Sequence, residues 1–319
     1  MKINKTISNR KGLPLIKPRT DLCAWGIVLT AWVLLAGVFW LLEPDRKTAR
    51  LPNAFYIWQR DWTDEVSQAA GRAADSACAF LVLAAEMKGG EGGIRPAMRL
   101  HPSWETLAKL QKPAVPVIRF DVKTAANLLP SRAGETVRRC GELIRGIVGD
   151  AAAGNLRVSE IQLDYDCPTS KLEDYRSFLQ ALKTECPEPA FSITALPSWM
   201  ESPAFAGLIR ETTAYVLQVN SLDRPKTVTD PIILCNVQKI PGYLRRADQL
   251  RHPYYLALPT YGYDVFFDDK GCFQGLSAEL ESVVSKPGTT VKRVMADPEE
   301  MAGVIRWLRR DLSVYCRGV

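Results

Sequence analysis

From residue 54 to its end the chain alternates short apolar runs with amphipathic segments. Predicted strands, rich in β-branched and aromatic residues, lie at 54–59, 77–87, 115–121, 158–166, 190–197, 214–220 and 254–262. Predicted helices begin near Thr63 and otherwise cover 103–111, 134–150, 172–183, 203–211 and 243–250. A later strand at 290–295 precedes a helix at 298–310. This alternation is typical of βα units around a parallel sheet.

Seven or eight βα units in a domain of this length favour a (β/α)8 barrel of the TIM type. The alternative is an open, doubly wound sheet, but no Gly-rich phosphate loop follows the first strand. The chain ends on VYCRGV, which has the pattern of one more strand. A barrel that is incomplete at its C-terminus is therefore one expectation.

One segment near the N-terminus has a different pattern. Leu22–Leu42 contains no charged residue and is long enough to cross a hydrocarbon core of roughly 30 Å. Its N-terminal flank is basic, which indicates a cytoplasmic N-terminus. The prediction is a basic tail (1–21), a single transmembrane anchor (22–42) in the lipid bilayer of the inner membrane, a linker (43–52) and a periplasmic or extracellular domain (53–319). A cleaved signal peptide is the alternative, although its apolar core is usually shorter.

The net charge of +6 comes almost entirely from that basic tail. The exported part is close to neutral, so the charge does not predict nucleic-acid binding. The chain has only two histidines and no CxxC pair, P-loop or Rossmann fingerprint. We therefore expect no metal site and no cofactor.

Eight cysteines are spread widely along the chain. Cys23 lies in the apolar segment, which leaves an odd number in the exported part. An oxidising compartment permits disulfides, but an odd number leaves at least one free thiol or an intermolecular bond. The sequence does not determine the pairing.

The predicted strand at 158–166 carries the candidate chemistry. Alternation places Glu160, Gln162, Asp164 and Asp166 on one face and apolar residues on the other. Polar groups that point into a barrel are costly to bury without partners. Repulsion between two neighbouring carboxylates raises the pKa of one of them, as a general acid requires. The alternative is a solvated edge strand with a polar face.

The ends of the other predicted strands supply groups that could surround these carboxylates, because strand ends line the open face of a barrel. Aromatic rings and amides together are typical of a sugar site, although each ring taken singly is more often part of the core than of a binding site. The predicted substrate-binding residues are Trp58, Arg60, Glu86, Asp121, Gln162, Trp199, Gln218, Asn220 and Tyr261.

Two segments resemble signatures of the chitinase-like family-18 glycoside hydrolases. IQLDYDCP (161–168) resembles their fourth-strand motif D-G-x-D-x-D-x-E-Y-P, and YLALPTYG (255–262) resembles their seventh-strand motif. The resemblance implies that Asp166 stands where the family has its acid glutamate. It also implies that Asp164 matches the aspartate that assists the substrate's acetamido group. The chain departs from the motif at Ser159 and Gln162, where the family has aspartates, and its acid is one methylene shorter.

A broader resemblance links the chain to an uncharacterised bacterial family, domain of unknown function 3142. It is carried by YIWQRDWT (56–63), IQLDYDCP (161–168), SITALPSW (192–199), VLQVNSL (216–222) and ALPTYGY (257–263). This resemblance implies a fold and leaves the activity open, because a fold does not determine function.

The first hypothesis is a membrane-anchored glycoside hydrolase that acts on an envelope or exported polysaccharide. Asp166 would be the general acid and base, and Asp164 its charge partner or the group that orients an acetamide. The second is a non-catalytic barrel that binds a glycan within a cell-envelope assembly. A purely structural envelope protein is a third possibility, but it does not explain the polar face at 160–166.

Overall fold

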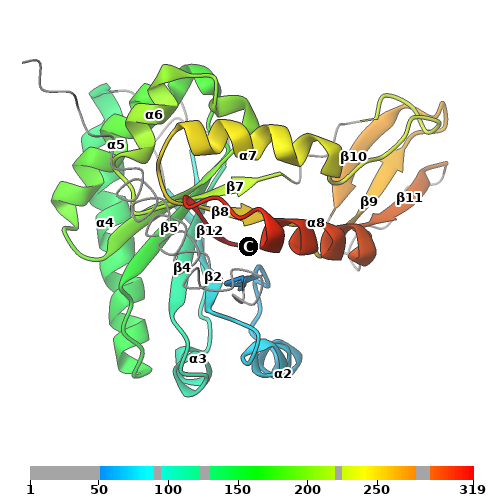
Figure 1. Ribbon diagram of the computed structural model, residues 1–319. Helices are drawn as coiled ribbons and strands as arrows, with labels where there is room; N and C mark the ends of the chain where they lie inside the picture. The colour runs from blue at the N-terminus through cyan, green and yellow to red at the C-terminus, as the bar shows by residue number, and fades with distance from the viewer. Residues whose placement is uncertain (1–50, 90–94, 122–129, 220–224, 278–287) are drawn as a thin grey trace, which may run out of the picture. The chain divides into compact units, whose positions relative to one another are not determined.

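The structure is a computed structural model that describes residues 51–89, 95–121, 130–219, 225–277 and 288–319 (Figure 1). These residues belong to one compact unit, Arg50–Val319. The predicted tail, the anchor at 22–42 and nearly all of the linker lie outside the described residues. Within the described part of the chain, no helix has the length and apolar character needed to cross a membrane.

Eight parallel strands form the main sheet, and each pairs with the next in the order given (Figure 1). They are β1 (Ala54–Ile57), β2 (Ala79–Lys88), β4 (Ala114–Phe120), β5 (Glu160–Tyr165), β6 (Ala190–Ala195), β7 (Tyr215–Gln218), β8 (Tyr254–Ala257) and β12 (Cys316–Gly318). The short β3 (Arg95–Arg99) pairs antiparallel with β2. The predicted α/β barrel architecture is therefore confirmed, and the strands correspond closely to the predicted runs.

Helices connect these strands, as in a (β/α)8 fold. They are α2 (Asp64–Ala73), α3 (Trp104–Lys109), α4 (Pro130–Ala153), α5 (Leu172–Glu185), α6 (Pro203–Ile209), α7 (Ile240–Gln249) and α8 (Pro298–Arg310). Single-turn 3₁₀ segments are η2 (Thr169–Lys171), η3 (Pro197–Trp199) and η4 (Val237–Lys239). Helix starts follow local chemistry, because Thr63 and Asp297 accept backbone N–H groups at the N-termini of α2 and α8.

The two ends of the described chain meet and join the ring of strands. The N–H of Ala54 donates to the carbonyl of Val319 at 2.7 Å, and the N–H of Val319 donates to the carbonyl of Pro52 at 2.9 Å. Gly318 has φ of +153° and lies so close to Pro52 that a Cβ atom would be 2.3 Å from the Pro52 carbonyl oxygen. The last strand, β12, pairs with β8, and Val319 directly after it accepts the hydrogen bond from Ala54 of β1.

A second, three-stranded antiparallel sheet corrects two of the strand predictions. Its order is β10 (Phe273–Ser277), β9 (Gly262–Phe267) and β11 (Thr290–Met295). The predicted strand at 290–295 exists, but it is β11 and lies outside the barrel. The predicted strand at 254–262 ends at Ala257, because the chain leaves the barrel there and enters this sheet, which projects beyond the start of α8 (Figure 1).

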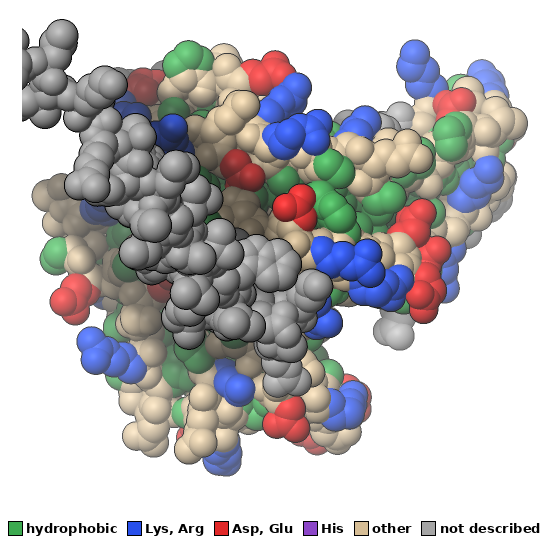
Figure 2. Space-filling view, viewed as in Figure 1, with side chains coloured by type: hydrophobic (Ala, Val, Ile, Leu, Met, Phe, Trp, Pro, Cys, Tyr) green, Lys and Arg blue, Asp and Glu red, His purple; other side chains and the backbone are tan. Residues whose placement is uncertain are grey.

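Acidic and basic side chains lie side by side over α8 and the small sheet on the face seen in Figure 2.

The long connection between β7 and α7 is joined to the small sheet, because the N–H of Phe273 donates to the carbonyl of Lys226 and the N–H of Val228 donates to the carbonyl of Gly271. These two backbone hydrogen bonds tie the small sheet to the connection between β7 and α7.

Candidate active site

Asp164 lies inside the barrel and is contacted from three other strands. Its side chain is on β5, and the residue is 7% exposed. Thr194 of β6 donates to Asp164 Oδ1 at 2.8 Å, and Gln218 of β7 donates to the same oxygen at 3.2 Å. The guanidinium Nε of Arg119, on β4, is 3.7 Å from Asp164 Oδ2. A buried carboxylate held by neutral donors with one loose cation is an unusual arrangement for a purely structural residue.

Gln162 lies one layer deeper on the same face of β5. The hydroxyl of Tyr56 donates to Gln162 Oε1 at 2.6 Å, and Gln162 Nε2 is 3.5 Å from the hydroxyl of Ser192. Gln162 is 1% exposed. It therefore links β1, β5 and β6 across the interior and does not line the open pocket where the sequence analysis placed it.

Asp166 follows the end of β5, is exposed, and lies at the mouth of a pocket of about 370 Å³. The carboxyl ends of parallel strands meet at this edge of the barrel, which is where barrel enzymes place their chemistry. The pocket is lined by Arg60, Glu86, Met87, Lys88, Arg119, Phe120, Asp121, Asp164 and Asp166. The structure thus brings together Asp164, Asp166, Arg60, Glu86 and Asp121 of the predicted site.

The pKa values of both aspartates are raised. Burial is the larger cause for Asp164, and repulsion from Asp166 comes second, while Thr194, Arg119 and Gln218 oppose the shift. Partial desolvation in the concave mouth also raises the pKa of Asp166, although the residue is exposed, and Arg119 lowers it. The predicted repulsion is present, but it is not the dominant cause. A carboxyl that keeps its proton above the ordinary range can act as a general acid.

Arg119 is a site residue that the predicted substrate-binding set omits. It is the register partner of Asp164 in the β4–β5 pairing, which brings the two side chains together. Its guanidinium carbon is 5.9 Å from the centre of the Trp58 ring, within the range of a cation–π contact. Trp58 in turn stacks on Tyr56, with ring centres 5.1 Å apart. Trp58 is not part of the pocket lining, but it contacts Arg119, which is.

Other predicted residues are not brought to the pocket. Trp199 is 1% exposed, its indole N–H donates to the carbonyl of Cys167 at 3.0 Å, and its ring packs against Phe205. It is a core residue and offers no free face to a sugar. Tyr261 is half-buried against the edge of the Tyr263 ring and does not line the pocket. Asn220 lies outside the described residues.

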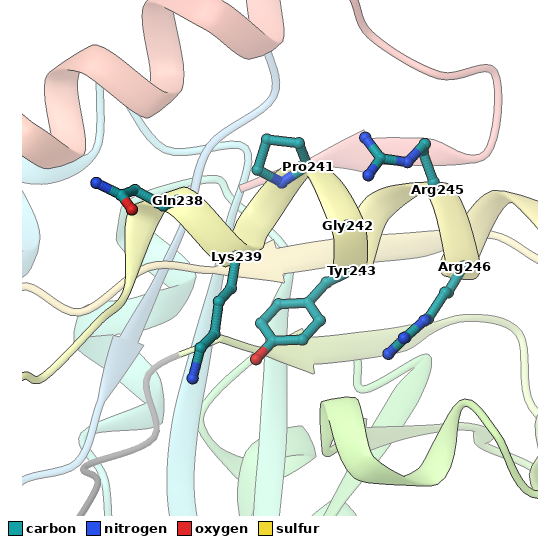
Figure 3. Close-up of a pocket in the computed structure, with 7 residues that line it drawn as sticks. All are labelled: Gln238, Lys239, Pro241, Gly242, Tyr243, Arg245 and Arg246. Atoms are coloured by element: carbon teal, nitrogen blue, oxygen red, sulfur yellow. The ribbon is translucent and has the colours of Figure 1, made fainter.

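A second depression of about 360 Å³ lies on the outer helix layer and shares no residue with the first. Its lining is basic and amide-bearing, and it follows η4 and α7: Gln238, Lys239, Pro241, Gly242, Tyr243, Arg245 and Arg246 (Figure 3). In Figure 3 Lys239, Tyr243 and Arg246 point to one side of the helix, away from Pro241 and Arg245. It holds no carboxyl group, so the pocket of Asp164 remains the candidate active site. Among the described residues, no group of three or more potential ligands could hold a metal ion.

The fold is similar to that of chitinase-like glycoside hydrolases. The spore cortex-lytic enzyme SleL of Bacillus cereus matches with a TM-score of 0.57 at 12% identity, covering 84% of this chain and 69% of that chain. A chitinase from Bacteroides thetaiotaomicron matches with a TM-score of 0.55 at 13% identity, covering 82% and 86%. A chitinase from Chromobacterium violaceum matches with a TM-score of 0.51 at 15% identity, covering 66% and 69%. Identities this low establish the fold alone.

No curated protein matches the chain. The family described as Domain of unknown function (DUF3142) matches residues 111–319, which include β5, β6, β7 and the β8–β12 region. This match covers well over half of the chain and confirms the resemblance carried by the strand motifs. The chain therefore belongs to the DUF3142 family.

Proposed function

We propose that this protein is a membrane-anchored glycoside hydrolase that cleaves an envelope or exported polysaccharide. One observation carries the proposal: Asp164 is buried among Thr194, Gln218 and Arg119, and Asp166 lies two residues further on at the mouth of the same pocket. The chitinase-like fold supports it, because this pocket is at the carboxyl ends of the barrel strands.

In this proposal Asp166 donates its proton to the glycosidic oxygen while the acetamido oxygen of the substrate bonds to the anomeric carbon and the bond to the leaving group breaks. Water then attacks that carbon, gives a proton to Asp166 and displaces the acetamido oxygen. Asp164 accepts hydrogen bonds from Thr194 and Gln218, so its orientation is fixed before substrate binds. From that position it would orient an acetamido group of the substrate, as the family-18 resemblance implies. Trp58, Arg60, Glu86 and Asp121 would surround the bound sugar.

The test is the Asp166→Asn variant of the full chain, measured by the release of reducing ends from amino-sugar and cell-wall polymers. Loss of general acid catalysis predicts a fall in turnover of about 10²–10⁴-fold. Asp269→Asn, at an exposed turn residue of the small sheet, is the matched control and should retain activity. Unchanged turnover in Asp166→Asn would rule out this assignment.

A non-catalytic glycan-binding barrel is the second candidate, and the ion pair between Arg119 and Asp164 favours it. A cation beside that carboxylate compensates charge that a hydrolase would use, and Gln162 replaces an aspartate of the family-18 motif. Binding of a polymer without any new reducing ends, in both the parent chain and Asp166→Asn, would support this candidate over the first.

We also propose that residues 22–42 anchor the protein in the inner membrane, with the N-terminus cytoplasmic and the barrel exported. The support is the uncharged run and its basic flank. The expected result is a chain that stays in the membrane fraction after alkaline extraction and whose barrel is digested by protease added to spheroplasts. Release into the soluble fraction at reduced mass would instead indicate a cleaved signal peptide.

A further inference from the structure

Three cations lie around the candidate pocket, contributed by three neighbouring strands of the barrel. Arg60 follows β1, Lys88 ends β2 and Arg119 is on β4. The side chains of Arg60 and Arg119 are 43% and 53% exposed, and Lys88 is also exposed. A ligand that enters the pocket can therefore reach these side chains, of which Arg60 already pairs with Glu86.

Two of the pocket's carboxylates are much less accessible than these cations. The Glu86 side chain is 14% exposed and accepts hydrogen bonds from Arg60 Nε and Nη2 at 3.1 and 3.0 Å. The Asp164 side chain is 10% exposed and is held by its hydrogen bonds within the barrel. Arg60 thus compensates the charge of Glu86, whereas Asp164 lines the pocket and would contact the acetamido group in the proposed reaction.

The remaining acids are Asp121 and Asp166. In the proposed reaction Asp166 carries the proton that it gives to the leaving group, so it is neutral when substrate is bound. Arg60 is paired with Glu86, so the exposed cations that remain for a ligand are Lys88 and Arg119, and Asp121 is the accessible carboxylate of the described lining beside them.

The contact geometry of Arg119 also leaves its guanidinium group able to bind a ligand. Its contact with Asp164 is 3.7 Å long, whereas a charge-assisted hydrogen bond is about 2.7–2.9 Å. The guanidinium fork is therefore not closed on that carboxylate, and a planar fork of donors is well suited to carboxylate and phosphate groups. Of the predicted stacking rings, Trp199 lies in the core and Tyr261 lies outside the pocket, which leaves Trp58, next to Arg119, as the aromatic face nearest to these charges.

We propose that the sugar bound in this pocket carries an acidic group, a carboxylate or a phosphate, that Lys88 and Arg119 hold, so that the substrate is an acidic polysaccharide. This inference rests on the proposed function, because it assumes that a glycan occupies the pocket. It differs from the neutral polymers that a chitinase name implies, and it assigns a specificity role to residues outside the strand motifs.

Binding is measured with the full chain in detergent, carrying Asp166→Asn so that no cleavage intervenes. The first ligand is an oligosaccharide of alternating N-acetylglucosamine and glucuronate, and the second is the same oligosaccharide after reduction of its carboxyl groups. The acidic form should bind about tenfold more tightly or better, as a charge-assisted hydrogen bond allows. The difference should shrink as salt is added. Competition by inorganic phosphate that exceeds competition by acetate would identify a phosphate site; the reverse order would identify a carboxylate site.

Lys88→Gln should reduce the preference for the acidic form several-fold and leave binding of the neutral form unchanged. Lys109→Gln, at an exposed lysine in the last turn of α3, is the matched control and should keep the full preference. Equal binding of the two forms by the parent chain, binding of neither, or an unaltered preference in Lys88→Gln would overturn the inference. A preference for the acidic form without hydrolysis of any polymer by the chain that retains Asp166 would leave the inference standing and refute the hydrolase.

Discussion

Two aspartates with similar exposure behave in opposite ways in the two sheets of this protein. Asp164 in the barrel is 7% exposed, and Asp264 in the small sheet is 8% exposed. The pKa of Asp164 is raised, mainly by burial. The pKa of Asp264 is lowered, mainly by its hydrogen bonds to Arg293, whose Nε and Nη2 lie 2.7 and 2.9 Å from its two carboxylate oxygens.

The difference follows from what surrounds each carboxyl. Asp264 makes a two-point ion pair with Arg293, and these hydrogen bonds outweigh the effect of burial on its pKa. Asp164 is enclosed by a ring of strands, where hydration is lost and the nearest cation is 3.7 Å away. A buried carboxyl is therefore a functional candidate when its charge is incompletely compensated, and a structural one when an arginine compensates it fully.

The largest expected effect is a difference in turnover between the variants Asp164→Asn and Asp264→Asn. Asp164→Asn should lower turnover of the polysaccharide by about 10²-fold or more, because the group that orients the substrate loses its charge. Asp264→Asn should leave turnover within about twofold, since its sheet position is outside the pocket lining. Reducing-end assays on both variants measure this contrast. Equal losses in the two variants would refute the distinction.

The same two variants should change stability in opposite directions at neutral pH. A raised folded-state pKa means that Asp164 destabilises the fold increasingly as the pH rises from the unfolded pKa through the folded one. Asp164→Asn should therefore stabilise the protein at pH 7, by about 1.4 kcal/mol for each unit of pKa difference. Asp264 has the opposite sign, because its lowered pKa contributes stability above the unfolded pKa, so Asp264→Asn should destabilise.

Denaturant unfolding of the full chain at pH 7 and again near pH 3 tests these signs. The gain from Asp164→Asn should diminish toward acid, where Asp164 is protonated in both states. The loss from Asp264→Asn should also diminish as the pH falls through the folded pKa of that carboxyl. A destabilised Asp164→Asn at pH 7 would mean that the hydrogen bonds from Thr194 and Gln218 compensate its burial fully.

Much of the barrel could be predicted from the sequence, because alternation and strand length are local properties. The strand at 158–166 is found as β5, with Gln162 and Asp164 facing inward as the two-residue period required. The helix at 298–310 coincides with α8, whose proline and acidic first turn mark its start. The final VYCRGV does open a strand, β12.

The features that were missed depend on contacts between distant segments. YDVFF in β9 has the apolar character of a barrel strand, and its antiparallel pairing with β10 and β11 assigns it to another sheet. Arg119 reaches Asp164 through strand register, which no local pattern reports. Trp199 follows a strand end, as a sugar-binding ring would, but the turn of η3 directs it into the core beside Phe205.

A smaller effect, on the pKa of Asp164, is expected from removing the hydroxyl of Thr194. Its hydrogen bond lowers the pKa of Asp164, so Thr194→Val should raise that pKa further. Thr194→Ser keeps the donor and is the matched control. Carboxyl titration by NMR measures the shift, and a downward shift in Thr194→Val would show that burial is not the dominant influence on Asp164.

The smallest effect is expected from Arg293→Lys in the small sheet. The lysine keeps the positive charge but loses the planar fork, so the pKa of Asp264 should move part of the way back toward its ordinary value of 3.8. Because the Arg293 side chain is 57% exposed, salt screens the pair, and acid unfolding of the variant and the parent should converge at high salt. If the acid unfolding of the variant and the parent still differed at high salt, Asp264 would be desolvated much as Asp164 is. The pKa values of the two aspartates would then differ only because Asp264 has an arginine partner at hydrogen-bonding distance and Asp164 does not.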